Sequence, residues 1–370
     1  MRILSVFGTR PEAIKMAPLI KEMERDPEIE SVVCVTAQHR EMLDQVLELF
    51  EIKPDYDLNI MKQNQTLTLI SESVLKEFEG VLQEVKPDMV LVHGDTTTTF
   101  AAALSSFYEK RAVGHVEAGL RTYNKYSPFP EEMNRVLTDR IADLLFAPTE
   151  RNRRNLLAEG VLEEKVFVTG NTVIDALLAT VEKPFEFEDE VLKGLDFDKS
   201  RVVTVTCHRR ENLGENMHSI FRAIRRAAEE FPDVEVVYPL HKNPKVRAIA
   251  DEELSGMDRV HLIEPLEYQE FSNLMNRSYL IVTDSGGIQE EAPSLGKPVL
   301  VVRSETERPE AVEAGTVRLA GVSEETIFQM LKLLLSDKER YDKMAHAENP
   351  YGDGHASERI VKILKEEIGR

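Results

Sequence analysis

Short runs of β-branched and apolar residues alternate with longer amphipathic stretches along nearly the whole chain, and this alternation constrains the fold most. A first series of strands is expected at residues 2–7, 32–36, 88–93, 112–116, 144–147 and 166–168. A second series is expected at residues 201–206, 234–238, 260–263, 279–282, 298–301 and 317–319. Nearly continuous apolar strands, each followed by a helix, predict parallel sheets that are covered by helices on both faces.

The segment between the two series, residues 182–199, has no clear period and is interpreted as a linker. Because 370 residues suit two domains, we predict an α/β protein with two Rossmann-like domains facing a central cleft. The N-terminal domain is expected to span residues 1–170 and the C-terminal domain residues 171–355. The sequence leaves open whether the last helix, residues 356–370, packs back on the first domain. Ligands of such sheets bind at the carboxyl ends of the strands.

Composition excludes several classes of partner and compartment. The 66 acidic and 46 basic side chains give a net charge of -20, which argues against nucleic acid or an anionic membrane as the main partner. An anionic substrate would therefore need local positive charge. Cys34 and Cys207 lie in apolar runs and are predicted to be buried, reduced thiols. No run approaches ~18 apolar residues and no signal-peptide core is visible, so a cytoplasmic protein is expected.

Several cofactor and catalytic motifs are missing from the sequence. No G-x-G-x-x-G follows a strand, and there is no G-x-x-x-x-G-K-[ST], G-x-S-x-G, H-E-x-x-H or C-x-x-C. These motifs mark dinucleotide sites, P-loops, serine hydrolases and metal or redox centres. We therefore expect neither NAD nor a bound metal.

Polar residues gather where the strands of the first series end. Arg10 and Lys15 flank a predicted helix start, which is a favourable site for an anion. Asp95 and Glu117 follow neighbouring strands, and Glu131 opens a later helix. Each has an ordinary alternative, because surface cations, an Asp cap and an acidic first turn also stabilise helices. Together, the three carboxylates would suit acid–base chemistry.

The second series carries cationic and glycine-rich strand ends. His208 follows its first strand, and Arg308 lies beside a proline after a later one. Where TDSGGIQEE passes from a strand into a helix, backbone N–H groups would form a phosphate cradle that is not a Walker motif, at Ser285, Gly286 and Gly287. Ordinary turns also use this composition.

These features fit one ligand better in combination than alone. Glu290 or Glu291, on the helix after the glycines, could reach ribose hydroxyls. A diphosphate nucleotide bound mainly by the second domain would present its other end to the carboxylates of the first. The combination therefore predicts a nucleotide-sugar as the substrate.

Seven motifs in order carry a resemblance to a known family: FGTRPEAIKMAPL, VHGDTTTT, VEAGLRT, SPFPEEMNR, HRREN, IVTDSGGIQEEAPSLGKPVLVVR and TERPEAV. The chain resembles the non-hydrolysing UDP-N-acetylglucosamine 2-epimerases over essentially its whole length. The resemblance implies a glycosyltransferase-B-type fold, a homodimer, and cytoplasmic interconversion of UDP-GlcNAc and UDP-ManNAc for surface polysaccharides. The active-site residues that it implies are Arg10, Lys15, Asp95, Glu117, Glu131, His208, Phe271, Ser285, Gly286, Gly287, Glu291 and Arg308.

The resemblance also implies a chemistry, in which UDP is eliminated to 2-acetamidoglucal and then added back. Asp95, Glu117 and Glu131 become the proton-transfer group, with Asp95 the first candidate for the base and the order of the three left open. His208 is expected nearest the bond that breaks. Phe271 would line the uracil pocket, although its pattern alone is that of a helix core.

A regulatory site and three other functions remain as alternatives. Gln38, His39 and Arg40 match a segment that binds a second UDP-GlcNAc in many members of the family. Asn64 stands where arginine is frequent and Glu41 where glutamine is frequent, so this site could be altered. The other functions are a glycosyltransferase of the same fold, a hydrolysing epimerase and a non-catalytic nucleotide-sugar sensor.

Overall fold

The computed structural model describes residues 1–36, 40–60, 65–182 and 184–368, and it divides the chain into two compact units. The first unit comprises Met1–Leu178 with Tyr351–Arg370, and the second comprises Ala179–Pro350. Each is a parallel sheet with helices on its faces, which confirms the predicted class of two α/β domains. Their expected placement around a shared cleft stays a prediction.

The first unit contains a seven-stranded sheet in the order β3-β2-β1-β4-β5-β6-β7. Its strands are rich in buried apolar residues, as in MVLVH of β4 and LLFA of β6, because helices cover both faces. The strands are β1 (Arg2–Phe7), β2 (Glu30–Val35), β3 (Tyr56–Asp57), β4 (Met89–His93), β5 (Ala112–Val116), β6 (Leu144–Ala147) and β7 (Val166–Val168).

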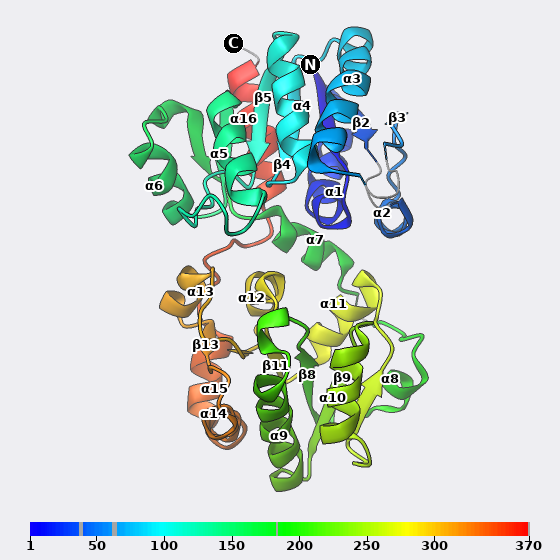
Figure 1. Ribbon diagram of the computed structural model, residues 1–370, viewed down its shortest axis with the longest axis vertical. Coiled ribbons are helices and arrows are strands. Elements are labelled where there is room, and N and C mark those ends of the chain that lie inside the picture. Colours follow the sequence, from blue (N-terminus) through cyan, green and yellow to red (C-terminus); the bar gives the residue numbers. More distant parts are fainter. Residues whose placement is uncertain (37–39, 61–64, 183, 369–370) are drawn as a thin grey trace. The chain divides into compact units, whose positions relative to one another are not determined.

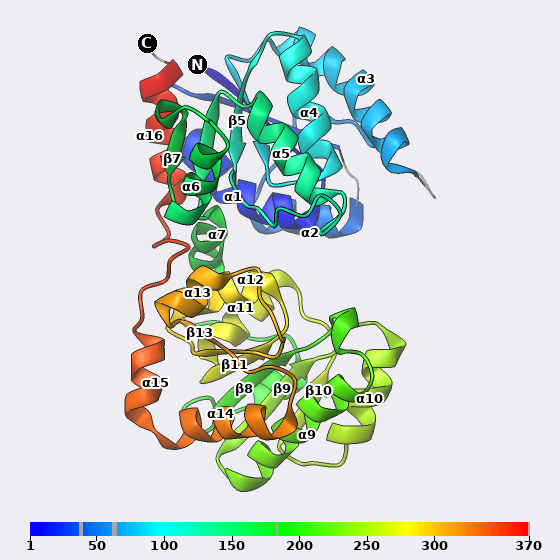
Figure 2. The same cartoon turned by 60° about the vertical axis from the view of Figure 1, so that its left-hand side comes forward.

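Helices α3, α4 and α5 cover one face of this sheet, and α1 and α16 pack together on the other (Figures 1 and 2). The last helix therefore belongs to the first unit, where Lys365 also pairs with Asp26 at 2.8 Å. The helices are α1 (Arg10–Arg25), α2 (Arg40–Leu49), α3 (Leu67–Val85), α4 (Thr97–Tyr108), α5 (Glu131–Ile141), α6 (Glu150–Ala158), η1 (Glu163–Lys165), α7 (Thr172–Thr180) and α16 (Ala356–Ile368).

The boundary of the first unit lies beyond the expected residue 170, and the chain returns to this unit at residue 351 rather than 356. Asp175 of α7 explains the shift, because it accepts hydrogen bonds from the backbone N–H of Ala356 at 3.2 Å and of Ser357 at 2.7 Å. The N–H of Asn171 also donates to the carbonyl oxygen of Tyr351 at 2.7 Å. These bonds hold α7 to the start of α16.

The second unit contains a six-stranded sheet in the order β10-β9-β8-β11-β12-β13 (Figure 2). The strands are β8 (Arg201–Thr206), β9 (Val234–Pro239), β10 (Val260–Ile263), β11 (Leu280–Thr283), β12 (Val299–Val301) and β13 (Val317–Leu319). The helices are α8 (Glu190–Gly194), η2 (Arg210–Asn212), α9 (Glu215–Glu230), α10 (Pro244–Leu254), α11 (Tyr268–Arg277), α12 (Gly286–Glu291), η3 (Ala292–Leu295), α13 (Pro309–Ala314), α14 (Glu324–Ser336) and α15 (Lys338–Ala345).

The interpretation of residues 182–199 as a linker is wrong. This segment contains α8 and buries Phe187 and Leu192 in a small core with Val202 and Leu274 of the second unit. Its phenylalanines have no helical or strand period because they pack on residues of the second unit, which supply apolar area that the segment itself lacks.

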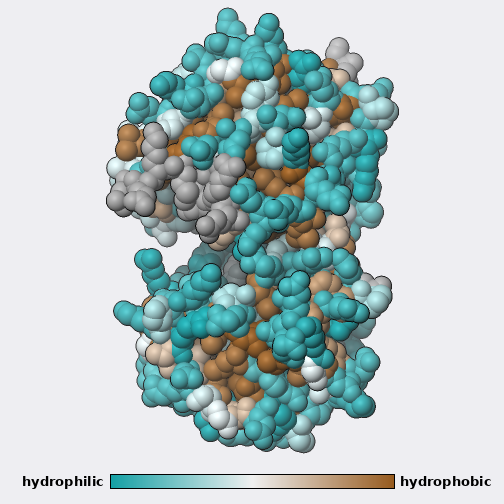
Figure 3. Space-filling model, turned by 90° about the vertical axis from the view of Figure 1, so that its right-hand side faces the viewer, coloured by the Kyte–Doolittle hydropathy of each residue, from teal (hydrophilic) through white to brown (hydrophobic). Residues whose placement is uncertain are grey.

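The surface carries most of the negative charge. Figure 3 shows one face covered largely by hydrophilic side chains, with apolar patches between them.

Cys34 and Cys207 are buried and free, as predicted, and burial raises the pKa of both thiols. Within the described ranges, no helix is long and apolar enough to cross a membrane. The buried acidic side chains among the described residues are Glu12, Glu132, Asp139, Asp175, Asp284, Glu290 and Glu291.

Candidate functional site

Two carboxylates follow adjacent strands at one edge of the first sheet. β4 and β5 pair in parallel register, with His93 opposite Val116, so Asp95 and Glu117 leave the sheet at the same edge. Parallel strands place such residues where α/β proteins bind ligands. The structure thus positions both predicted carboxylates at the carboxyl ends of neighbouring strands.

Each of these carboxylates has a cationic partner. Arg135 of α5 pairs with Asp95 at 2.5 Å, and Lys15 of α1 pairs with Oε2 of Glu117. The side-chain amide of Asn171 also donates to Oε2 of Glu117, at 2.9 Å. The predicted residues Lys15 and Glu117 are therefore in direct contact. The Glu117 carboxylate is oriented by two donors, Lys15 and Asn171, from distant parts of the chain.

The backbone of Glu117 is in the left-handed region, with a φ of 67°. A residue with a Cβ costs about 1 kcal/mol or more there and persists only when its surroundings hold it. Gly94, after the adjacent strand, also has a positive φ of 68°, and a Cβ built on it would lie in ordinary van der Waals contact with Oε1 of Glu117, at 3.8 Å. Backbone strain of this kind is frequent at functional sites.

Glu12 ties the turn after β1 to the turn after β4. One of its oxygens accepts hydrogen bonds from the N–H of Gly8 at 3.1 Å and from the N–H and hydroxyl of Thr9 at 2.8 and 2.7 Å. The other accepts from the hydroxyls of Thr96 at 2.7 Å and Thr99 at 3.0 Å. Burial raises the pKa of Glu12, and these hydrogen bonds oppose that rise. This network fixes the start of α1 beside the turn after β4, which carries the catalytic candidate Asp95.

Arg10 and Glu131 open helices α1 and α5 and are partly exposed. The neighbouring Glu132 is buried instead and accepts hydrogen bonds from the N–H groups of Thr122 and Tyr123 at 3.1 and 2.9 Å. Glu132 therefore belongs to the scaffold. Glu131 opens α5, whose Arg135 pairs with Asp95, and its place beside the other two carboxylates stays a prediction.

In the second unit, a buried carboxylate organises the HRREN loop. Asp284 follows β11 and accepts hydrogen bonds from the N–H of His208 at 3.0 Å, the N–H of Arg209 at 2.9 Å and the amide of Asn212 at 3.0 Å. Asp284 is fully buried. Its sequence pattern did not predict this role, because an aspartate before Ser-Gly-Gly is also typical of ordinary turns.

His208 is held as a partly exposed imidazole. Its Nδ1 lies 3.6 Å from Asp284, and its ring stacks on His241 with centroids 5.1 Å apart and planes 9° from parallel. Burial lowers the pKa of His208, with Asp284 acting in the opposite direction and His241 and Arg209 adding to the decrease. The neutral ring, which can both donate and accept a hydrogen bond, is thereby favoured.

Arg308 lies against the glycine-rich start of α12. Its Nε donates to the buried carboxylate of Glu290 at 2.7 Å, and a Cβ built on Gly286 would lie 3.3 Å from its Cζ. A side chain at Gly286 would therefore require the Arg308 guanidinium to shift by a few tenths of an ångström. Ser285 caps the helix and Gly287 is exposed, so the predicted cradle and the predicted cation are adjacent.

Glu291 is contacted from the start of α11. The hydroxyl of Tyr268 donates to its Oε1 at 3.1 Å. Phe271 lies three residues further along the same helix and is partly exposed, so it is not a fully buried core residue. Tyr268 was missed, and the only signal for it was its place one turn before Phe271.

Two further groups of residues give little support for a site. Gln38, His39 and Asn64 lie outside the described residues, and Arg40 begins α2. In the described ranges, one cluster has metal-ligand spacing: His218, Glu252 and Glu253, whose ligand atoms lie within 4.8 Å of one another. Its Glu253 oxygen already contacts the His218 ring at 2.7 Å and the Arg222 guanidinium at 3.4 Å. A guanidinium at that oxygen disfavours a cation.

Comparison with known proteins identifies the family. The model of the UDP-N-acetylglucosamine 2-epimerase family matches residues 21–365. The UDP-N-acetylglucosamine 2-epimerase of Bacillus subtilis is 59% identical over 364 residues, which are 98% of this chain and 95% of that protein. Among solved structures, the Neisseria meningitidis UDP-GlcNAc 2-epimerase bound to UDP-GlcNAc is 55% identical, with a TM-score of 0.87 over 99% of this chain and 100% of the other.

A second solved structure, Staphylococcus aureus MnaA with UDP, is 52% identical and has a TM-score of 0.89 over 100% of this chain and 97% of the other. The likeness extends over both units, which is consistent with the expected glycosyltransferase-B-type fold. The chain therefore belongs to the UDP-N-acetylglucosamine 2-epimerase family of isomerases.

Proposed function

We propose that this enzyme reversibly converts UDP-GlcNAc into UDP-ManNAc by inverting C2 of the sugar. The observation that carries the proposal is the pair of carboxylates, Asp95 and Glu117, fixed by Arg135 and Lys15 at adjacent strand ends. Acid–base chemistry needs such positioned groups. Family membership supplies the substrate, since a relative at 55% identity is solved with UDP-GlcNAc.

The proposed reaction is an elimination followed by an addition. The C2–H bond of GlcNAc is not next to a carbonyl, so a base removes that proton while the C1–O bond to UDP breaks, which leaves 2-acetamidoglucal and UDP. A proton then returns to C2 on the opposite face as the UDP oxygen attacks C1. No step of this elimination and addition transfers a hydride, so the reaction needs no NAD, and we expect no metal either.

The proposed site residues are assigned three different parts of the reaction. Asp95, Glu117 and Glu131 transfer protons in an order that we leave open. Arg10, Lys15, His208 and Arg308 stabilise the diphosphate as it departs, because fixed donors aimed at developing charge lower the barrier. The remaining proposed contacts to UDP are the cradle at Ser285, Gly286 and Gly287, Glu291 at the ribose and Phe271 at the uracil.

The direct test is incubation with UDP-GlcNAc alone in deuterated water, followed by NMR. The proposal requires UDP-ManNAc with deuterium at C2 in both sugars. A glycosyltransferase would leave the substrate unchanged without an acceptor, a hydrolysing epimerase would release free ManNAc with UDP, and a sensor would bind without exchange. Any of these three results would refute the proposal.

Asp95→Asn is the matched site variant for that assay. Loss of a proton-transfer group lowers turnover by ~10²-fold or more. Glu150→Gln, which makes the same carboxylate-to-amide change on exposed α6, should keep wild-type turnover. Wild-type turnover in Asp95→Asn would remove Asp95 from the mechanism.

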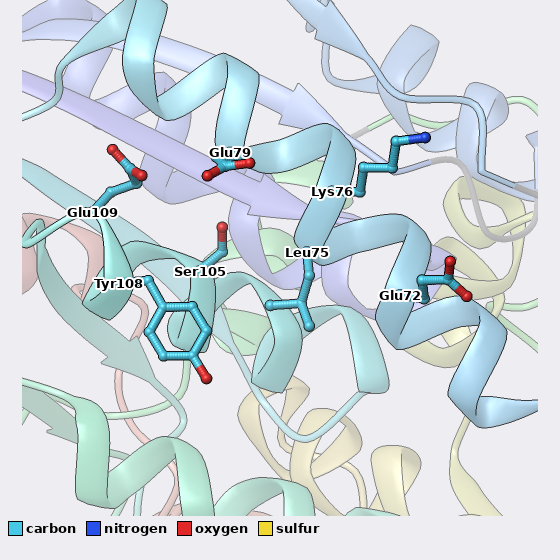
Figure 4. A pocket seen from close by; sticks show the side chains of 7 residues that line it. All are labelled: Glu72, Leu75, Lys76, Glu79, Ser105, Tyr108 and Glu109. Carbon is cyan, nitrogen blue, oxygen red and sulfur yellow. The ribbon is translucent and has the colours of Figure 1, made fainter.

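We also propose that the enzyme is a homodimer that pairs through α3 and α4. Leu69, Phe107 and Tyr108 are large apolar side chains exposed on these helices, and exposed apolar patches mark protein interfaces. A pocket of about 370 Å³ lies between the two helices (Figure 4), lined by Glu72, Leu75, Lys76, Glu79, Ser105, Tyr108 and Glu109. Sedimentation of the wild type and of Phe107→Glu tests this, and a monomeric wild type or a dimeric variant would refute it.

The cellular role is proposed on the family alone. We place the enzyme in the cytoplasm, where it supplies ManNAc units for surface polysaccharide, with no nucleic-acid or membrane partner. A regulatory UDP-GlcNAc site at Gln38, His39 and Arg40 predicts sigmoidal kinetics with UDP-GlcNAc. Hyperbolic kinetics from UDP-ManNAc without added UDP-GlcNAc would count against it.

A further inference from the structure

His93, the last residue of β4, is a buried imidazole whose ring finds no hydrogen-bond partner among the described residues. Its side chain is only 4% exposed, and within the described ranges neither Nδ1 nor Nε2 has a partner. A buried polar group left unpaired costs about 1–3 kcal/mol, and native proteins leave few of them. The position of this ring therefore calls for a functional explanation.

The carboxylate of Glu117 lies close to the ring. Nε2 of His93 lies 3.8 Å from Oε2 of Glu117, which is too long for a hydrogen bond. That oxygen already accepts from Lys15 and from Asn171, and one carboxylate oxygen has about two acceptor positions. His93 is thus a third donor beside an oxygen whose positions are filled.

The charge state of the ring suits a neutral donor. Burial lowers the pKa of His93 to about 3; Lys15 and His115 lower it too, and Glu117 opposes them. Near pH 7 the ring is therefore uncharged, with one N–H. His115 does not compete for this role, since its two ring nitrogens contact Asp139 at 2.6 Å and the carbonyl oxygen of Gly94 at 2.7 Å.

We propose that His93 is a positioning residue that donates Nε2–H to Oε2 of Glu117 when Lys15 turns from Glu117 to the diphosphate of the substrate. The carboxylate then exchanges a charged donor for a neutral one. It keeps its orientation through His93 and Asn171, and its affinity for a proton rises because the neighbouring cation has left. The inference rests on the proposed roles of Glu117 in proton transfer and of Lys15 in diphosphate binding.

His93→Leu and His93→Gln test this, because leucine has no donor and the glutamine amide can place an N–H near the position of Nε2. For His93→Leu we expect kcat to fall by ~10²-fold with KM within ~3-fold, whereas His93→Gln should stay within ~10-fold of wild type. Without the donor the carboxylate holds its proton to higher pH, so the acidic limb of kcat should move up by about one pH unit in His93→Leu.

Ser5→Ala is the matched control, because Ser5 is another fully buried residue of the same sheet whose side-chain oxygen has no partner among the described residues. It should leave kcat and its pH profile unchanged. If His93→Leu does not fold, His93→Asn replaces it, since the shorter amide falls short of Oε2; it should be at least ~10-fold slower than His93→Gln.

Glu117→Gln separates failure of this inference from failure of the proposed function. An inactive Glu117→Gln together with wild-type kcat and pH profile in His93→Leu, or with equal rates in His93→Asn and His93→Gln, would overturn the role of His93. Wild-type turnover in Glu117→Gln would instead overturn the proposed role of Glu117.

Discussion

Asp284→Ala should destabilise the second unit and weaken UDP binding together. The carboxylate is fully buried and accepts from the N–H groups of His208 and Arg209 and from the amide of Asn212. Removing the carboxylate leaves these donors without their acceptor. The donors belong to the loop that carries His208, which is proposed to bind the diphosphate. The loop follows β8 and Asp284 follows the adjacent β11, so the change also loosens the junction of two central strands.

The magnitude follows from those three hydrogen bonds. Bonds to a charged group contribute about 1.5–3 kcal/mol each, and a donor left buried costs about 1–3 kcal/mol. Because the loop can relax and water can reach part of it, we expect a loss of about 3–5 kcal/mol in the free energy of unfolding. Asp284→Asn keeps one oxygen as an acceptor and should lose about half as much.

Denaturant unfolding of the intact protein measures the first effect, and calorimetric titration with UDP measures the second. UDP affinity should fall at least ~10-fold in Asp284→Ala, which is about 1.4 kcal/mol of binding energy. Asp258→Asn, at an exposed position, should change neither quantity. If the free energy of unfolding of Asp284→Ala lies within about 1 kcal/mol of the wild-type value, the carboxylate does not organise the loop.

Two further predictions test backbone and charge effects. Gly119→Ala should lower the free energy of unfolding by about 3 kcal/mol or more, because φ is +87° and the new Cβ would lie 2.5 Å from the carbonyl oxygen of Asn152. Gly160→Ala, with φ of +82° and open space, should lower it by only about 1 kcal/mol. Equal losses in the two variants would refute the clash. Arg303 lowers the pKa of Glu307 to about 2 against burial, so its stabilisation is complete above about pH 4.5 and is lost as pH falls toward 2. In Glu307→Gln, the midpoint of unfolding should depend less steeply on pH across that acidic range. The same dependence on pH as in the wild type would refute this.

The fold was largely predictable because parallel strands buried on both faces leave a local signature. β4 and β6 are nearly continuous apolar runs, so their existence needed no knowledge of their partners. β3 was missed because its two residues, Tyr56 and Asp57, are too few to form a pattern. The segment at residues 182–199 was misassigned because Phe187 is buried only by residues from elsewhere in the second unit.

The candidate site was predictable only where it coincides with strand ends. Glu117 stands directly after β5 and Asp95 two residues after β4, and this local rule found both. Asn171 and Asp284 escaped because their roles depend on partners 54 and 76 residues away, Glu117 and His208. A single sequence gives no signal for such distances, whereas packing of the strands brings each pair together.

The net charge of -20 raised the question of how an anionic substrate could bind, and the structure gives it a sharper form. The cations proposed for the diphosphate are not isolated, since Lys15 contacts Glu117 and Arg308 contacts Glu290. A diphosphate that attracts Lys15 must therefore compete with the carboxylate proposed to move the proton. Competition of this kind couples substrate binding to the basicity of Glu117, because the carboxylate loses its cation only when the leaving group is in place. A free enzyme would then hold Glu117 as a weak base, and the affinity of this carboxylate for a proton would rise only with UDP-sugar bound.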